Sequence, residues 1–249
     1  MEENSRQVVM AANWKMNHDL VSAVAFMNKI KPLVRQAQCQ IIVFPPAILI
    51  PDVVAETHES KITVGAQNIH WEKTGAYTGE ISVGMIKEAG CRYCLCGHSE
   101  RRHYFDESSD MITRKVQAAF AQGIIPILCV GETLEQRQNG ETMEFLNDDL
   151  HACLAGVAPN EELIIAYEPV WAIGTGVVAS MQDAEEAIAY IRCVLREMWD
   201  EAADQIRILY GGSVRPDNIS QLMQCPNIDG ALVGGASLQA DSFAAIVNY

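Results

Sequence analysis

Residues that could do chemistry follow five short apolar runs of this sequence. The runs are residues 7–12, 91–96, 162–166, 205–210 and 229–233. They lead, in this order, to Asn13 and Lys15, to His98 and Glu100, to Glu168, to Gly211-Gly212-Ser213 and to Gly234-Gly235. A carboxylate base opposite imidazole, ammonium and amide donors can remove a proton next to a carbonyl, while the donors hold the oxygen that becomes negative. Glycine turns offer backbone N–H groups of the kind that bind phosphate.

The segment after Glu168 has the composition of a lid. Pro169 lacks an N–H and cannot continue a strand, residues 170–173 are apolar, and Gly174 and Gly176 supply permissive backbone. A lid that closes here would exclude water from Glu168, and burial would raise the pKa of its carboxyl group. The alternative is an ordinary surface loop that happens to contain Glu-Pro.

The elements that must position these residues alternate between strands and helices. Apolar runs predict strands at residues 7–12, 40–44, 61–66, 91–96, 124–130, 162–166, 205–210 and 229–233. Helical patterns cover residues 19–38, 48–57, a short segment ending at Ala89, 106–122, 133–155 with an interruption at Asn139-Gly140, 182–201, 216–223 and 237–247. Asp106 and Ser108 are the candidate N-caps of the fourth of these helices.

Eight strand–helix units predict an α/β fold, a (β/α)₈ barrel with eight parallel strands. The predicted strands are runs of Val, Ile and Leu without alternation, as expected where both faces of a sheet are covered. We expect a single catalytic domain over residues 1–249. A doubly wound sheet is the alternative, but Asn13-Trp14-Lys15 replaces its usual glycine fingerprint after the first strand. In a barrel, the carboxyl ends of all strands meet on one rim, so the groups above would converge.

The composition and charge of the chain limit which partners it can bind. The 249 residues are 49% hydrophobic and 20% charged, with a formal net charge of −14. This charge disfavours nucleic acid and anionic membranes as partners, and an anionic substrate would need a local positive site such as Lys15. With no cationic start before an apolar segment and no long apolar run, we expect a cytoplasmic protein. The run Cys91-x-x-Cys94-x-Cys96 suggests zinc, but its strand-like context and the lack of a second Cys/His pair favour buried thiols, so we expect no metal and no cofactor.

These residues suit an aldose–ketose isomerisation of a small phosphorylated molecule. Glu168 is the base, and His98, Lys15 and Asn13 are the donors. A Schiff-base aldolase that uses Lys15 is one alternative, and a sugar-phosphate-binding protein without catalysis is another. The second predicts loss of Glu168, His98 or Lys15, and all three are present.

Five motifs together resemble the triosephosphate isomerase family. They are Asn13-Trp14-Lys15-Met16-Asn17, Gly97-His98-Ser99-Glu100-Arg101-Arg102, Ala166-Tyr167-Glu168-Pro169-Val170-Trp171-Ala172-Ile173-Gly174-Thr175-Gly176, Tyr210-Gly211-Gly212-Ser213 and Leu232-Val233-Gly234-Gly235-Ala236-Ser237. The resemblance implies interconversion of dihydroxyacetone phosphate and D-glyceraldehyde 3-phosphate, in glycolysis and gluconeogenesis. It implies that Glu168 is the base, that His98 is a neutral electrophile and that Lys15 and Asn13 bind the substrate. It also implies phosphate contacts from Gly174, Ser213, Gly234 and Gly235, with Glu100 as a supporting partner. We expect the apolar side chains of Ile173 and Leu232 to surround Glu168 and exclude water from it.

The long loop that begins at Gln67 and ends at Gly79 exceeds an ordinary barrel connection. The resemblance implies that it inserts into a second subunit, giving a homodimer. Two departures from the family are Ala11-Ala12 before Asn13, where Gly is usual, and Val177-Val178 after the lid, where Lys and a small residue are common. Two β-branched residues predict a stiffer hinge.

Overall fold

The computed structural model describes residues 6–172 and 179–249. Within these residues eight parallel strands pair in sequence order, and β1 pairs with β8 to close a barrel. The strands are β1 (Val9–Asn13), β2 (Gln40–Phe44), β3 (Ile62–Ala66), β4 (Tyr93–Cys96), β5 (Ile125–Val130), β6 (Ile164–Tyr167), β7 (Arg207–Tyr210) and β8 (Gly230–Val233). The predicted fold class is confirmed, and each strand overlaps the apolar run that predicts it.

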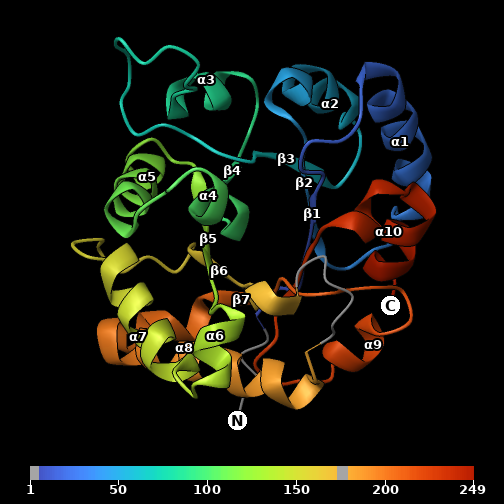
Figure 1. Cartoon of the computed structure of the whole chain (residues 1–249). Helices are drawn as coiled ribbons and strands as arrows, with labels where there is room; N and C mark the ends of the chain where they lie inside the picture. Colours follow the sequence, from blue (N-terminus) through green and yellow to red (C-terminus); the bar gives the residue numbers. More distant parts are fainter. Residues whose placement is uncertain (1–5, 173–178) are drawn as a thin grey trace.

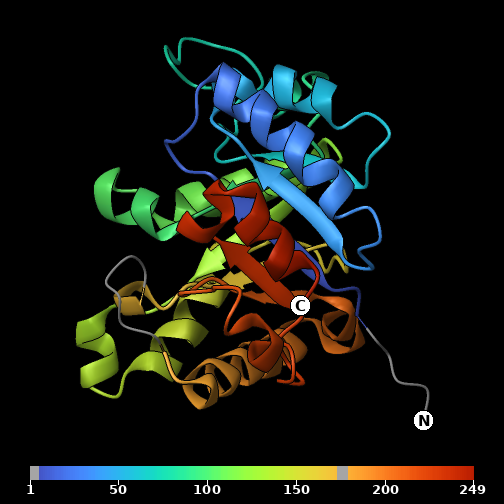
Figure 2. The same cartoon turned by 90° about the vertical axis from the view of Figure 1, so that its right-hand side faces the viewer.

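Helices surround the barrel (Figure 1). They are α1 (Leu20–Leu33), α2 (Ile50–Glu56), α3 (Val83–Glu88), α4 (Ser99–Tyr104), α5 (Ser109–Ala121), α6 (Leu134–Gln138), α7 (Thr142–Cys153), α8 (Met181–Trp199), α9 (Ile219–Leu222) and α10 (Ala240–Val247), with short 3₁₀ helices η1 (Ala47–Leu49), η2 (Val170–Ala172), η3 (Asp200–Gln205) and η4 (Gly235–Leu238). Helices α1 and α10, from opposite ends of the chain, pack against each other, as Figure 2 shows. No helix in the described ranges is long and apolar enough to cross a membrane.

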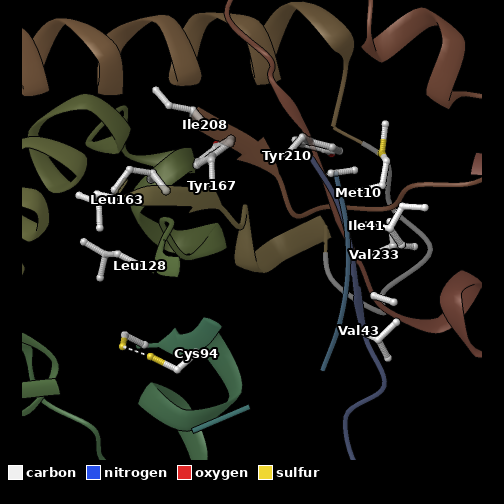
Figure 3. Close-up of a cluster of buried hydrophobic side chains, with 14 of the residues drawn as sticks. Met10, Ile41, Val43, Cys94, Leu128, Leu163, Tyr167, Ile208, Tyr210 and Val233 are labelled. Atoms are coloured by element: carbon white, nitrogen blue, oxygen red, sulfur yellow. Dashed lines mark hydrogen bonds between the residues drawn. The ribbon is translucent and has the colours of Figure 1, made fainter. Parts of the chain in front are cut away.

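Strand side chains form two apolar layers because successive residues point to opposite faces. Along β1, Val9 and Ala11 belong to the cluster inside the barrel, whereas Met10 and Ala12 belong to the cluster between barrel and helices. Figure 3 shows part of this outer cluster, with Cys94 among its members. Burial of both faces explains why the strands read as continuous apolar runs.

The helices differ from the sequence prediction most clearly at α4 and α1, whereas the predicted interruption at Asn139-Gly140 is confirmed. The sequence pattern does not predict α4, because residues 99–104 are mostly polar and leave no apolar face. Helix α1 ends at Leu33, earlier than predicted, with Pro32 in its last turn. The helix predicted over 133–155 is divided into α6 and α7, as Asn139-Gly140 indicates. Of the two candidate caps, Ser108 caps α5 by accepting a hydrogen bond from the N–H of Met111.

Candidate active site

Lys15 is fixed at the carboxyl end of β1 by a strained turn. Its φ is 52°, in the left-handed region that costs a residue with a side chain free energy. Asn13, the last residue of β1, compensates because its Oδ1 accepts from the Lys15 N–H at 3.1 Å. Gln67 donates to the Lys15 carbonyl at 2.8 Å. The turn aims the ammonium group across the rim, where Nζ lies 2.6 Å from Oε1 of Glu100.

His98 links β4 to α4. Gly97 has a φ of 73°, which lets the chain turn, and His98 then occupies the N-cap position of α4. Its Nδ1 accepts a hydrogen bond from the backbone N–H of Glu100 at 3.2 Å. A neutral imidazole that accepts at Nδ1 carries its proton on Nε2. This Nε2 lies 3.1 Å from Oε1 of Glu168.

Glu168 follows β6 directly and is buried, with 2% of its surface exposed. Its N–H continues the barrel ladder by donating to the Val130 carbonyl at 2.7 Å. The second carboxylate oxygen, Oε2, accepts from the backbone N–H of Ser99 at 3.0 Å. The β5–β6 pairing and the start of α4 together therefore hold the carboxylate at the rim.

The two buried groups shift each other's pKa. Burial alone would raise the pKa of Glu168, but His98 and the Ser99 N–H outweigh it, and the net pKa is lowered. Burial lowers the pKa of His98, the Glu168 carboxylate raises it, and the net pKa is raised. We nevertheless assign a neutral His98, because a proton on Nδ1 would face the N–H of Glu100. In the state described here, the expectation of a raised Glu168 pKa is wrong, because it took account of burial and omitted the donors.

The glycine turns after β7 and β8 line the same cavity as these groups. The cavity has a volume of about 330 Å³, and its walls include Asn13, Lys15, His98, Glu168, Gly211, Gly212, Ser213, Leu232, Gly234 and Gly235. A Cβ built on Gly234 would lie 3.4 Å from Cε of Lys15, so the cation and the second turn are neighbours. A Cβ on Gly235 would meet no atom within 4 Å, which leaves this backbone open to the cavity. Asn218 donates to the Ser213 carbonyl at 2.9 Å and so stabilises the first turn.

Two glycines that the sequence analysis did not connect with the base make room for Glu168. A Cβ on Gly131, after β5, would lie 1.9 Å from the Glu168 carbonyl oxygen. A Cβ on Gly211, after β7, would lie 2.8 Å from Cγ of Glu168. The sequence predicts a phosphate turn at Gly211 and no role beside the base, and the sequence signal for both glycines is their place directly at a strand end.

Glu132 is a further rim residue that the sequence analysis missed. This fully buried carboxylate accepts hydrogen bonds from the Tyr167 hydroxyl at 3.0 Å and from Nε1 of Trp171 at 2.8 Å. It therefore ties the end of β6 to η2, the segment that follows Glu168. Nη1 of Arg137 lies 3.7 Å from Oε1 of Glu132, the oxygen that accepts from Trp171.

The structure brings together Asn13, Lys15, His98, Glu168, Ser213, Gly234 and Gly235, and it places Glu100 against Lys15 at the edge of the cavity. Leu232 lines the cavity as expected. Gly174, Ile173, Val177 and Val178 lie outside the described residues, as do the last residues of the predicted lid. Within residues 6–172 and 179–249, no group of three or more His, Cys, Asp or Glu side chains could hold a metal ion.

This fold and site define a (β/α)₈-barrel enzyme with a carboxylate, an imidazole and an ammonium group at the carboxyl ends of its strands. The family model described as triosephosphate isomerase matches residues 8–249. The chain therefore belongs to the triosephosphate isomerase family and is an isomerase.

Individual relatives agree with this assignment. The triosephosphate isomerase of Moorella thermoacetica is 49% identical over 246 residues, which covers 98% of this chain and 99% of the relative. The enzyme of the same name from Clostridium botulinum is 49% identical over 247 residues, with 98% and 100% coverage. The crystal structure of triosephosphate isomerase from Bartonella henselae superimposes with a TM-score of 0.89 at 37% identity, covering 96% of this chain and 97% of that one.

Proposed function

We propose that this protein interconverts dihydroxyacetone phosphate and D-glyceraldehyde 3-phosphate through an enediolate, in glycolysis and gluconeogenesis, and that it acts in the cytoplasm. Family membership supports the reaction. The observation that carries the assignment of roles is the 3.1 Å contact between Nε2 of His98 and Oε1 of Glu168, in a cavity that Lys15 also lines. All eight cysteines are free thiols, the state that a reducing cytoplasm maintains.

Glu168 is the base in this proposal. Its lowered pKa keeps the carboxylate ionised, so it is ready to take a proton from the carbon next to the carbonyl. Both of its oxygens are engaged by His98 and the Ser99 N–H before substrate binds. The substrate must therefore approach a lone pair that neither donor occupies, or displace one of these donors, before proton transfer begins. The protonated Glu168 then returns the proton to the neighbouring carbon, and the isomerisation is complete when the hydroxyl proton has also passed from the oxygen that becomes the new carbonyl to the former carbonyl oxygen.

His98 is the electrophile. Its Nε2–H donates to the substrate carbonyl oxygen and stabilises the negative charge that develops there. The substrate that separates His98 from Glu168 also removes the charge that raises the His98 pKa. The imidazole therefore becomes less readily protonated at the moment when a neutral donor is needed.

Lys15, Asn13 and the glycine turns bind the substrate. Lys15 offsets the charge of the phosphate and the enediolate, and Asn13 orients the reacting oxygen. Ser213, Gly234 and Gly235 contribute backbone groups to the phosphate, next to the Lys15 side chain. Gly174 is proposed as a further phosphate contact from the resemblance alone.

The reaction is tested by a coupled isomerase assay on the wild type and on Glu168→Gln. We expect an active wild type and a loss of about 10²- to 10⁴-fold in kcat for the variant, because a positioned base contributes this much. Glu135→Gln, on the exposed face of α6, is the matched control and should keep wild-type activity. An inactive wild type would reject the proposed reaction.

The aldolase alternative is disfavoured by the ion pair between Lys15 and Glu100, because an ammonium held at 2.6 Å from a carboxylate is not a free amine nucleophile. Borohydride reduction in the presence of dihydroxyacetone phosphate distinguishes an aldolase from an isomerase. We expect no covalent adduct by mass spectrometry, whereas an adduct on Lys15 would support the aldolase.

We also propose that the protein acts as a homodimer through the loop from Gln67 to Gly79. A second cavity of about 500 Å³ adjoins the active site and shares Asn13, Lys15 and His98 with it. Met16, which also lines this cavity, is 96% exposed in the single chain. Tyr77 and Phe105 add further exposed apolar surface. A second copy that inserts its loop here would cover this surface and support Lys15.

Sedimentation velocity tests the dimer. We expect the wild type to sediment at twice the chain mass and Met16→Asp to shift towards the monomer with reduced activity. Leu134→Asp is the control, because Leu134 on α6 is also exposed, at 52%, but lies outside this cavity. A wild type that is fully active as a monomer would reject the proposal.

A further inference from the structure

Arg102 on α4 joins the two strand ends that carry the acid–base pair. Its Nε donates to the Gly97 carbonyl at 2.8 Å, and its Nη2 donates to the Cys129 carbonyl at 2.8 Å. Nη1 donates to Oδ1 of Asp149 on α7, also at 2.8 Å. One guanidinium group therefore connects the chain after β4, strand β5 and helix α7 through all three of its nitrogens.

The two carbonyls lie where the backbone ladder between β4 and β5 ends. The last residues in register are Cys96 and Leu128. Gly97 and Cys129 are the next residue on each strand, and Arg102 binds both of their carbonyls. The guanidinium therefore continues the connection between the two strands for one residue beyond their direct pairing.

Each carbonyl is linked to one member of the pair, the first by sequence and the second by a backbone hydrogen bond. Gly97 directly precedes His98. Cys129 directly precedes Val130, whose carbonyl accepts the Glu168 N–H at 2.7 Å. The spacing of Gly97 and Cys129 therefore affects the position of both the imidazole and the carboxylate.

The partner that holds the Arg102 guanidinium, Asp149, is itself fixed by neighbouring side chains. Oδ1 of Asp149 accepts from Sγ of Cys153 at 3.3 Å and from Ser109 at 3.4 Å, and the Asp149 side chain is 4% exposed. A Cβ on Gly97 would lie 3.1 Å from Nη2 of Arg102, so the guanidinium packs directly against the backbone that leads to His98. A lysine could supply the charge at this place but not the planar fork that reaches two carbonyls and a carboxylate.

We propose that Arg102 is a positioning residue that sets the distance between His98 and Glu168, and with it the rate of proton transfer. Arg102 does not line the cavity that Lys15, His98 and Glu168 share, although it lines a neighbouring cavity together with Glu168, so we assign its effect to the backbone of Gly97 and Cys129. A displacement of about 1 Å in a catalytic group can cost on the order of 100-fold in rate. The inference rests on the proposed function.

Arg192 provides a matched control. It is a buried arginine that also binds two carbonyls, those of Ile206 and Asn227, and a carboxylate, Asp229. These partners lie at the amino ends of β7 and β8, the opposite end of the barrel from the site. Arg102→Gln leaves the buried Asp149 carboxylate without this cation, whereas in Arg192→Gln Asp229 keeps the Arg6 guanidinium at 2.6 Å. Both variants should lose stability, and only Arg102→Gln should lose kcat.

The experiment compares kcat and KM of Arg102→Gln and Arg192→Gln in the purified full chain, at a temperature where circular dichroism shows both folded. We expect Arg102→Gln to lower kcat at least about tenfold with KM changed less than about threefold. Arg192→Gln should stay within about twofold of wild type in both constants. Proton NMR of the His98 Nε2–H should show a changed resonance in Arg102→Gln and an unchanged one in Arg192→Gln.

Arg102→Lys keeps the test valid if Arg102→Gln does not fold. Lysine retains a charge near Asp149 but cannot bridge both carbonyls, so we expect the same loss of kcat. Variants of Arg102 that match Arg192→Gln in kcat, or that raise KM alone, would overturn the inference. An inactive wild type would instead reject the proposed function.

Discussion

Glu100 contacts His98 through its own backbone N–H and Lys15 through its own side-chain carboxylate. Its N–H donates to Nδ1 of His98 at 3.2 Å, and its carboxylate lies 2.6 Å from Nζ of Lys15. The first contact leaves the proton of the neutral imidazole on Nε2, the atom that faces Glu168. The second holds a cation next to the glycine turn at Gly234. One residue at the start of α4 therefore places two groups that act on the same substrate.

The Nε2–H of His98 should be essential for turnover rather than for binding. We expect His98→Gln to lower kcat by about 100-fold with a much smaller change in KM, since a donor aimed at a developing oxyanion contributes about this much. Steady-state kinetics in both directions of the reaction measure it. His103→Gln is the control, because His103 is exposed on the same helix. A kcat for His98→Gln within threefold of wild type would contradict the role of His98.

The opposite pKa shifts of His98 and Glu168 predict which group limits activity in acid. Because the pKa of His98 is raised and that of Glu168 is lowered, the neutral imidazole is lost first as pH decreases, and kcat/KM should fall through the folded pKa of His98 while Glu168 is still ionised. A pH profile of kcat/KM with dihydroxyacetone phosphate measures this limb. An acid limb below the ordinary pKa of a glutamate would contradict this order, because the enzyme would then be active with a protonated His98.

The lowered pKa of Glu168 also predicts a pH dependence of stability. A depressed folded pKa means that ionised Glu168 contributes stability above the unfolded-state pKa, and that this contribution is lost as pH falls through the folded pKa. We expect the free energy of unfolding of the wild type to fall towards that of Glu168→Gln on acidification. Urea titrations at a series of pH values test this. A difference between the two proteins that is constant with pH would refute it.

The barrel and its rim could be predicted from sequence because their causes are local. Buried parallel strands must be apolar, so the runs that end before Lys15, His98 and Glu168 are visible without coordinates. Closure of the barrel then brings the strand ends to one rim, whatever the side chains are. This logic needs no knowledge of how any two side chains are oriented.

The details that tune the site could not be predicted because they depend on contacts distant in sequence. Helix α4 has no apolar face, and its cap is His98 instead of a residue typical of caps. The Glu168 pKa depends on a donor 69 residues away, the N–H of Ser99. The strained φ of Lys15 is held by Gln67, from the loop after β3.

Gly211 should be required for the position of Glu168. A Cβ here would lie 2.8 Å from Cγ of Glu168, so Gly211→Ala must displace the Glu168 side chain. We expect kcat to fall by about tenfold or more. The control is Gly84→Ala in α3, where the nearest atom to a new Cβ is a side-chain oxygen at 3.4 Å. Kinetics with a thermal melt measure both, and an unchanged kcat in Gly211→Ala would show that Glu168 has room to adjust.

Leu232 should keep the surroundings of Glu168 dry. It belongs to the apolar cluster inside the barrel and also lines the active-site cavity, whereas Leu209 belongs to the same cluster without lining the cavity. Truncating either buried leucine to alanine should cost about 2–5 kcal/mol of stability. Only Leu232→Ala opens space beside the carboxylate, so water should enter and strengthen the solvation of its charge, which weakens the base. We expect kcat to fall about tenfold in Leu232→Ala with KM less affected, and to stay near wild type in Leu209→Ala. Equal kcat in the two variants would mean that Leu232 contributes packing alone, because stability loss is common to both and access to Glu168 is not.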